Sequence, residues 1–165
     1  MKKNNKGFSY VELILVIAIA AILMGLVGLT IGLVSRTNVN KAGDKLYTTM
    51  NQARATTMGK GGNTQIEIYC QGNEYYYFVG DPSKDNREEL SVSFIAKPAV
   101  VSYIDEGEST AVALGDGDSL IVKYDKASGA FASSVNCEYI IISNGDKEAK
   151  IRLYHATGKC DFVYN

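Results

Sequence analysis

The chain has 165 residues, of which 46% are hydrophobic and 21% charged, which is typical of one globular domain. Seventeen basic and eighteen acidic residues give a formal net charge of −1. That balance excludes a global basic field, so we expect no nucleic acid among the partners. Three cysteines are too few for a disulfide scaffold.

A long apolar segment, Leu13–Val34, follows the N-terminus. It contains no charged side chain, and its 22 residues would rise about 33 Å as a helix, close to the thickness of a bilayer core. Lys2, Lys3 and Lys6 precede it with no acid among residues 1–7, which favours a cytoplasmic N-terminus. The sequence therefore predicts a single-pass cytoplasmic membrane protein whose remaining chain is exported.

A motif stands at the start of the apolar segment. A short basic leader ends in Gly7, Phe8 follows, and Glu12 is the fifth residue after the Gly7–Phe8 junction. The stretch KGFSYVELILVIAIAAIL, residues 6–23, resembles the class III signal of type IV prepilins and type II secretion pseudopilins. The resemblance implies that a prepilin peptidase cuts between Gly7 and Phe8 and methylates the new amino group of Phe8. It also implies that Glu12 pairs with the N-terminal amine of a neighbouring subunit.

Two other kinds of N-terminal segment fit the residues less well. A cleavable secretory signal has an apolar core of about 7 to 15 residues, which is shorter than this one. A plain anchor, carrying a binding domain that never polymerises, has no use for Glu12, whose charge is costly beside an apolar run. The amine of a neighbouring subunit would compensate that charge only in register, so Glu12 is expected to set the register of assembly.

Three glycines, Gly25, Gly28 and Gly32, lie within the apolar segment, and the last two have the GxxxG spacing. They predict either close packing between helices or nothing beyond the high frequency of glycine in membrane helices. Both alternatives remain open at this point.

The helical pattern continues beyond the apolar segment to about Met58, where a cluster of glycines ends it. Charged and polar residues separate a stripe of residues that recur at spacings of three or four. The stripe consists of Val39, Ala42, Leu46, Met50, Ala53 and Thr57. The second half of the helix is therefore expected to pack one face on a domain.

The remaining sequence predicts strands separated by turns. The expected strands are Gln65–Cys70, Glu74–Val79, Leu90–Ile95, Val100–Ile104, Leu120–Tyr124, Glu138–Ser143, Ala149–Tyr154 and Cys160–Val163. One long helix followed by an antiparallel sheet is an α+β fold, and the resemblance implies the pilin fold. The expected parts are the leader at 1–7, a transmembrane or filament-core helix at 8–34, its amphipathic continuation at 35–58, and a β-rich head at 59–165.

The head carries a second, looser resemblance. The stretches NQARATTMGKGG, YDKASGAF at Tyr124–Phe131 and IRLYHATGKCDF at Ile151–Phe162 resemble H-type minor pseudopilins and related minor pilins, in which the last hairpin often turns on a Thr-Gly pair. Here that pair is Thr157 and Gly158. The resemblance favours a minor subunit, with a major pilin or a DNA-uptake pseudopilin as alternatives.

Candidate chemistry in the head is sparse. Cys137 and Cys160 would close a loop worth about 3 kcal/mol as a disulfide, although other pairings with Cys70, or three buried thiols, fit the sequence too. The run Gly115–Ser119 lacks the acids of a calcium loop and is interpreted as a turn. His155 has no partner set for catalysis. No metal, cofactor or enzymatic activity is predicted.

These observations lead to one functional expectation. The chain is a structural subunit, minor rather than major, of a type IV pilus or a type II secretion-like pseudopilus. Its expected partners are the prepilin peptidase, other pilin or pseudopilin subunits in a homo- or hetero-filament, a membrane assembly platform and the lipid bilayer. The head would leave the cytoplasmic membrane as part of an extracellular or cell-surface filament.

Overall fold

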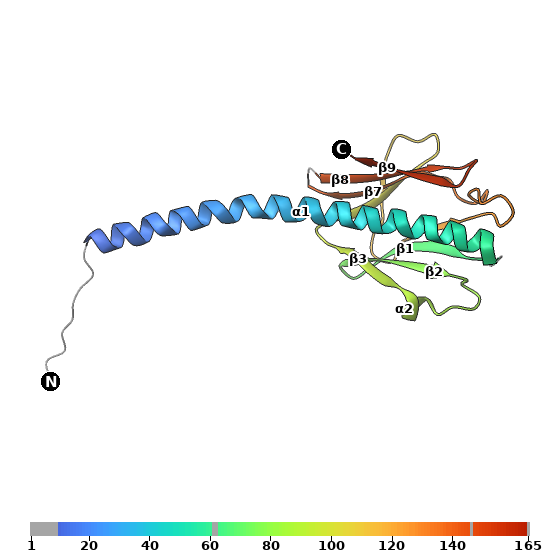
Figure 1. The fold of residues 1–165 in the computed structure, drawn as a ribbon, viewed down its shortest axis with the longest axis horizontal. Coiled ribbons are helices and arrows are strands. Elements are labelled where there is room, and N and C mark those ends of the chain that lie inside the picture. The colour runs from blue at the N-terminus through green and yellow to red at the C-terminus, as the bar shows by residue number, and fades with distance from the viewer. Residues whose placement is uncertain (1–9, 61–62, 146, 165) are drawn as a thin grey trace. The chain divides into compact units, whose positions relative to one another are not determined.

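The computed structural model describes residues 10–60, 63–145 and 147–164, and gives the backbone alone for residues 23–37, 60 and 164. Its contacts divide the chain into two compact units, Met1–Ser35 and Arg36–Asn165. One helix, α1 (Tyr10–Lys60), extends from the first unit into the second (Figure 1). Within the described residues, no helix has a stretch long and apolar enough to cross a membrane. The spanning role of Leu13–Val34 therefore stays a prediction.

The second unit contains two antiparallel sheets. In the four-stranded sheet the order is β3-β2-β1-β6, and in the five-stranded sheet it is β5-β4-β7-β8-β9. The strands of the first sheet are β1 (Gln65–Gln71), β2 (Glu74–Gly80), β3 (Val92–Ala96) and β6 (Ser119–Lys123). Those of the second are β4 (Val100–Asp105), β5 (Val112–Ala113), β7 (Cys137–Asn144), β8 (Lys147–Tyr154) and β9 (Lys159–Tyr164).

The α+β class is confirmed, but the head differs from a single sheet. The chain moves to the second sheet at β4 and returns to the first at β6, which pairs with β1 from Gln65↔Lys123 to Tyr69↔Ser119. Such pairings join residues far apart in sequence, so local patterns do not predict them. Strand β5 and the short helix α2 (Arg87–Leu90) were also missed, because two to four residues are too few to show a period.

The core of the head lies between α1 and both sheets. The predicted stripe on α1 is buried, with Val39, Leu46 and Met50 fully inaccessible to solvent. It joins one hydrophobic cluster with residues such as Ile66 from β1 and Ile140 from β7. In Figure 1 this part of α1 lies between strands β7–β9 on one side and β1–β3 on the other. Burial of this apolar face, more than helix propensity, holds the second half of α1 in place.

Strand β1 departs from the alternation of a strand with one solvated face, since six of its seven residues are buried. The side facing away from the core is covered by Arg87 of α2. Its guanidinium lies 3.1 Å from the Glu67 carboxylate and 3.8 Å from the centre of the Tyr69 ring. Arg87 of the short helix therefore covers the face of β1 that points away from the core.

Candidate functional site

The structure describes the predicted assembly motif from Tyr10 onward, where α1 begins. Glu12 lies in the first turn, where the partial positive charge of a helix N-terminus favours a carboxylate. Its side chain is exposed. Gly7 and Phe8, the predicted processing residues, lie outside the described residues.

The residues that follow Glu12 are apolar and exposed on every side of the helix. Leu13, Ile14, Leu15, Val16 and Ile17 are consecutive, so they cover more than one full turn, and each exposes 51–59% of its surface. A soluble helix normally exposes apolar side chains on no more than a narrow part of its circumference. A continuous apolar surface of this kind indicates a segment that is covered by lipid or by other chains.

The surroundings of the predicted packing glycines are not part of the description. Gly25, Gly28 and Gly32 lie in the stretch of α1 for which only the backbone is given. Their role in helix packing stays a prediction.

Arg54 attaches the end of α1 to two turns of the head. Its Nε donates a hydrogen bond to the carbonyl oxygen of Gly129, and its Nη2 donates one to that of Thr157, each at 2.8 Å. The helical pattern alone places Arg54 among the charged residues that separate the apolar stripe, so it does not predict this role. Its position directly after the buried Ala53, at the border of the apolar stripe, was the available signal.

The two turns held by Arg54 also contact each other. Gly158, in the turn between β8 and β9, has a φ of +65°, and a Cβ atom there would overlap the Gly129 carbonyl oxygen. The predicted Thr157–Gly158 turn is therefore present, and it requires glycine both for its left-handed backbone and for lack of space.

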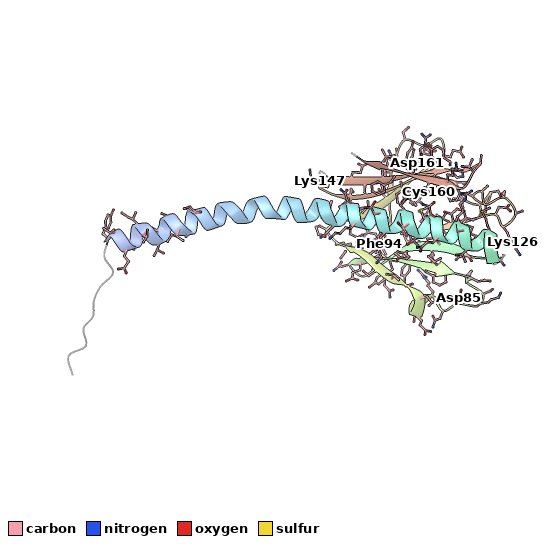
Figure 2. The ribbon with its side chains drawn as sticks, viewed as in Figure 1. Asp85, Phe94, Lys126, Lys147, Cys160 and Asp161 are labelled. Carbon is pink, nitrogen blue, oxygen red and sulfur yellow. The ribbon has the colours of Figure 1, made fainter. Side chains whose placement is uncertain are left out.

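All three cysteines are free and buried. Cys137 lies on β7 and Cys160 on β9, with β8 between them in the sheet (Figure 2 labels Cys160). Two strand spacings are about 9.6 Å, whereas the Cα atoms of a disulfide are normally within about 7 Å. Cys137 and Cys160 are both free thiols in this structure, and the strand order disfavours a bridge between them. The disulfide stays a prediction.

Burial keeps the thiols of Cys137 and Cys160 protonated. It raises the pKa of Cys137 from an ordinary value of 9.0 to about 12, with a smaller contribution from the nearby Asp105 carboxylate. Burial likewise raises the pKa of Cys160 to about 12. The hydroxyl of Tyr124 lies near Cys160 without a hydrogen bond of good geometry, and burial raises its pKa strongly as well. The cluster behaves as packed core and not as a reactive centre.

The run Gly115–Ser119 forms a turn. Asp118 accepts a hydrogen bond from the Gly115 N–H at 2.8 Å, and Asp116 accepts one from the Gly72 N–H at 2.7 Å. Both carboxylates therefore bind backbone groups. Over the described ranges, no three His, Cys, Asp or Glu side chains gather in a way that could hold a metal ion.

His155 packs in the head beside Cys137 and Phe131. Its Nε2 lies 3.0 Å from the Cys137 carbonyl oxygen, and its ring is 5.8 Å from that of Phe131. These contacts fit a structural role for the side chain.

The comparisons with known proteins identify the N-terminal segment. Residues 2–28 match the family model for the prokaryotic N-terminal methylation motif. The comparisons with curated proteins and with solved structures give no match. The resemblance to the class III signal of type IV pilins and pseudopilins is thus confirmed at the motif.

The motif has direct implications for the class of protein. It indicates a prepilin-type N-terminal segment, and it covers residues 2–28 alone. It implies processing by a prepilin peptidase and assembly with other pilin-like subunits, from a membrane-anchored form to a surface filament.

Proposed function

We propose that this chain is a minor structural subunit of a type IV pilus or a type II secretion-like pseudopilus. A prepilin peptidase cuts it between Gly7 and Phe8 and methylates Phe8. The apolar first half of α1 anchors the chain in the cytoplasmic membrane with the N-terminus inside. It then becomes the core of a filament in which Glu12 pairs with the amine of a neighbouring Phe8.

The observation that carries this proposal is the methylation motif at residues 2–28, with Gly7, Phe8 and Glu12 at the required spacing. Two features of the structure support it. The helix exposes apolar side chains around its whole circumference after Glu12, and its second half is joined to a β-rich head by a buried stripe. An anchor and a head of this kind suit polymerisation from a membrane.

The assignment as a minor subunit has narrower support. It depends on the Thr157–Gly158 turn and on the loose resemblance of the head to H-type minor pseudopilins. A major pilin and a DNA-uptake pseudopilin share the same processing and the same anchor. The abundance of the chain in purified filaments, relative to the other subunits, would separate these roles.

The first experiment measures the N-terminus. The membrane-extracted chain, co-expressed with a prepilin peptidase, is analysed by intact mass and N-terminal sequencing for wild type and for Gly7→Val. We expect the wild type to begin at methylated Phe8 and the variant to retain residues 1–7. The wild type in cells that lack the peptidase is the matched control.

Other outcomes would point elsewhere. A wild-type chain that still starts at Met1 beside an active peptidase would indicate a plain membrane anchor carrying a binding domain. A cut well after residue 34 would indicate an ordinary secreted domain.

A further inference from the structure

A cavity of about 410 Å³ lies at the end of the four-stranded sheet where β1 begins and β6 ends. Gln65, the first residue of β1, and Lys123, the last of β6, both line it. Its sides are the turn after β2, with Asp81, and the segment after β6, with Asp125 and Lys126. Figure 2 labels Lys126 beside the C-terminal end of α1. The volume lies in the range of small-molecule sites, about 300 to 1,000 Å³.

Gln65 points away from the hydrophobic core and is nevertheless buried. The next residue, Ile66, belongs to the core cluster, and successive side chains of a strand alternate between its two faces. Gln65 therefore shares the outer face of the sheet with Lys123, which is its cross-strand partner. It exposes 4% of its surface, and no described residue forms a hydrogen bond with its amide. Buried amides normally have such a partner, so this amide is available to a ligand in the cavity.

Both sides of the cavity are held in shape by hydrogen bonds within their own turns. Asp81 accepts hydrogen bonds from the Ser83 N–H at 3.1 Å and from its hydroxyl at 2.6 Å, and Lys84 lies 3.6 Å from its other oxygen. Asp125 accepts hydrogen bonds from the Ser128 N–H at 2.8 Å and from its hydroxyl at 2.7 Å. The cavity is therefore preformed, and a ligand does not have to order its sides.

The charges around the cavity balance, since Lys123 and Lys126 face Asp81 and Asp125. The salt bridges of the described residues include neither of these two lysines, so both ammonium groups remain available as donors. Asp125 binds its own turn through Oδ1 alone, so its Oδ2 remains available as an acceptor. The Gln65 amide can donate and accept. A neutral site with both donors and acceptors suits hydroxyl groups, which also donate and accept, better than it suits a strongly charged ligand.

We propose that this cavity binds a neutral, hydroxyl-rich ligand, a saccharide. The two ammonium groups donate to its hydroxyl oxygens, while the Asp125 carboxylate and the Gln65 amide oxygen accept from its hydroxyl groups. Pro82 and Ala132 add apolar surface for the C–H groups of a sugar ring. The inference does not depend on the proposed function, because processing and assembly involve the N-terminal segment and this cavity lies in the head.

Saturation-transfer-difference NMR tests the site on the full chain, solubilised in a polyoxyethylene detergent, which contains neither sugar nor phosphate. The probes are glucose, galactose, mannose, N-acetylglucosamine, maltose and lactose, each titrated separately. The variants are Gln65→Leu and Lys123→Met. Their matched controls are Gln71→Leu, at the exposed other end of β1, and Lys97→Met, an exposed lysine after β3.

We expect at least one probe to bind the wild type and both controls alike. Its dissociation constant should rise about tenfold in Gln65→Leu and several-fold in Lys123→Met, because each variant removes a hydrogen-bonding group from the site. Gln65→Leu should also keep or raise the thermal midpoint of unfolding, since an amide without an internal partner is replaced by an apolar side chain. A purely structural amide would instead lower the midpoint when replaced.

Three results would overturn the saccharide site. The first is a wild type that binds none of these probes. The second is equal binding by the wild type and Gln65→Leu, which would place the sugar elsewhere on the chain. The third is displacement of the sugar by an equal concentration of inorganic phosphate, which would indicate an anion site. The assay uses neither the peptidase nor filaments, so each of these results leaves the proposed function intact.

Discussion

Arg54 shows how much of the head depends on a single side chain. It lies on α1, yet its hydrogen bonds reach Gly129 and Thr157, which are 75 and 103 residues further along the chain. Both acceptors are backbone carbonyls of turns, and a guanidinium can satisfy both because its donors are fixed in a plane. The helix is thereby fastened to the two turns at one end of the head.

Replacing this side chain tests its contribution. We expect Arg54→Met to lower the free energy of unfolding of the head by about 1 to 3 kcal/mol, because two carbonyls lose a charged donor. The measurement is urea unfolding of the detergent-solubilised chain, followed by near-UV circular dichroism of its tyrosines. Gln52→Met, at an exposed position of the same helix, is the control, and an equal effect of both variants would contradict the role of Arg54.

Gly158 is the second residue whose identity the structure requires. We expect Gly158→Ala to destabilise the head by several kcal/mol, since it adds a Cβ overlap with Gly129 to an unfavourable backbone conformation. Gly145→Ala is the matched control, because Gly145 has a similar φ of +60° with open space around it. That control should cost about 1 kcal/mol, the penalty of the left-handed backbone alone. Equal losses in the same unfolding assay would show that space at Gly158 is not limiting.

The buried thiols predict a loss of stability at high pH. The pKa values of Cys137 and Cys160 are about 12 in the folded chain and about 9 when exposed. Above pH 9 the unfolded chain therefore releases protons that the folded chain retains, so the stabilisation is complete below pH 9 and is lost as pH rises towards 12. Between these values each thiol should lower the free energy of unfolding by about 1.4 kcal/mol per pH unit.

Unfolding measured in steps from pH 8 to pH 11 checks this expectation. The double variant Cys137→Ala with Cys160→Ala should have a shallower dependence, although its stability at pH 8 will be lower. Part of the slope above pH 10 should persist, because burial also raises the pKa of Tyr124 and Tyr75. An unchanged slope in the double variant would mean that the thiols do not control the alkaline transition.

At the scale of elements, α1 has two halves with different requirements. In the first half, the large apolar side chains that are described, from Leu13 to Ile22, are exposed. The second half buries a stripe of regular spacing against both sheets. Periodicity predicted the stripe because a helix that packs on one side must repeat its apolar residues about every 3.6 positions.

Leu46, which is fully buried at the centre of that stripe, tests the packing of the second half. We expect Leu46→Ala to cost about 2 to 5 kcal/mol, from lost burial and from the cavity that remains. Thr48→Ala, on the exposed side of the helix, should change stability by less than about 0.5 kcal/mol. Thermal unfolding of the two solubilised variants compares them, and similar midpoints would argue against packing of α1 on the sheets through this stripe.

The strands were predicted by their composition, but their grouping was not. Alternation and turn residues located the long strands to within a few residues, because each of these signals is local. Strand β1 reads as half-exposed in sequence, yet Arg87 and α2 cover its second face. That cover comes from residues about 20 positions away, so the pattern of β1 itself contains no sign of it.

At the scale of the whole molecule, the proposed role of Glu12 concerns assembly and not processing, so a variant can separate the two steps. We expect Glu12→Ala to be cut at Gly7 and methylated like the wild type, but to lose filaments, because the amine of the next subunit then has no carboxylate to pair with. Intact mass reports processing, and electron microscopy of sheared material reports assembly. Glu12→Asp keeps the charge and should retain part of the assembly. Normal filaments from Glu12→Ala would refute the pairing.

The sequence by itself determined the N-terminal identity of this protein and the outline of its head. The N-terminal methylation motif at residues 2–28 is a linear pattern, so no fold is needed to detect it. The long helix and most strands likewise follow from short-range periodicity.

Only the tertiary structure decided how those elements are joined. The division into two sheets, the hydrogen bonds of Arg54 to two distant turns, and the separation of Cys137 from Cys160 by β8 all depend on contacts between residues far apart in sequence. The physical reason is that such contacts are selected by the packing of the complete core, which no local stretch of residues contains.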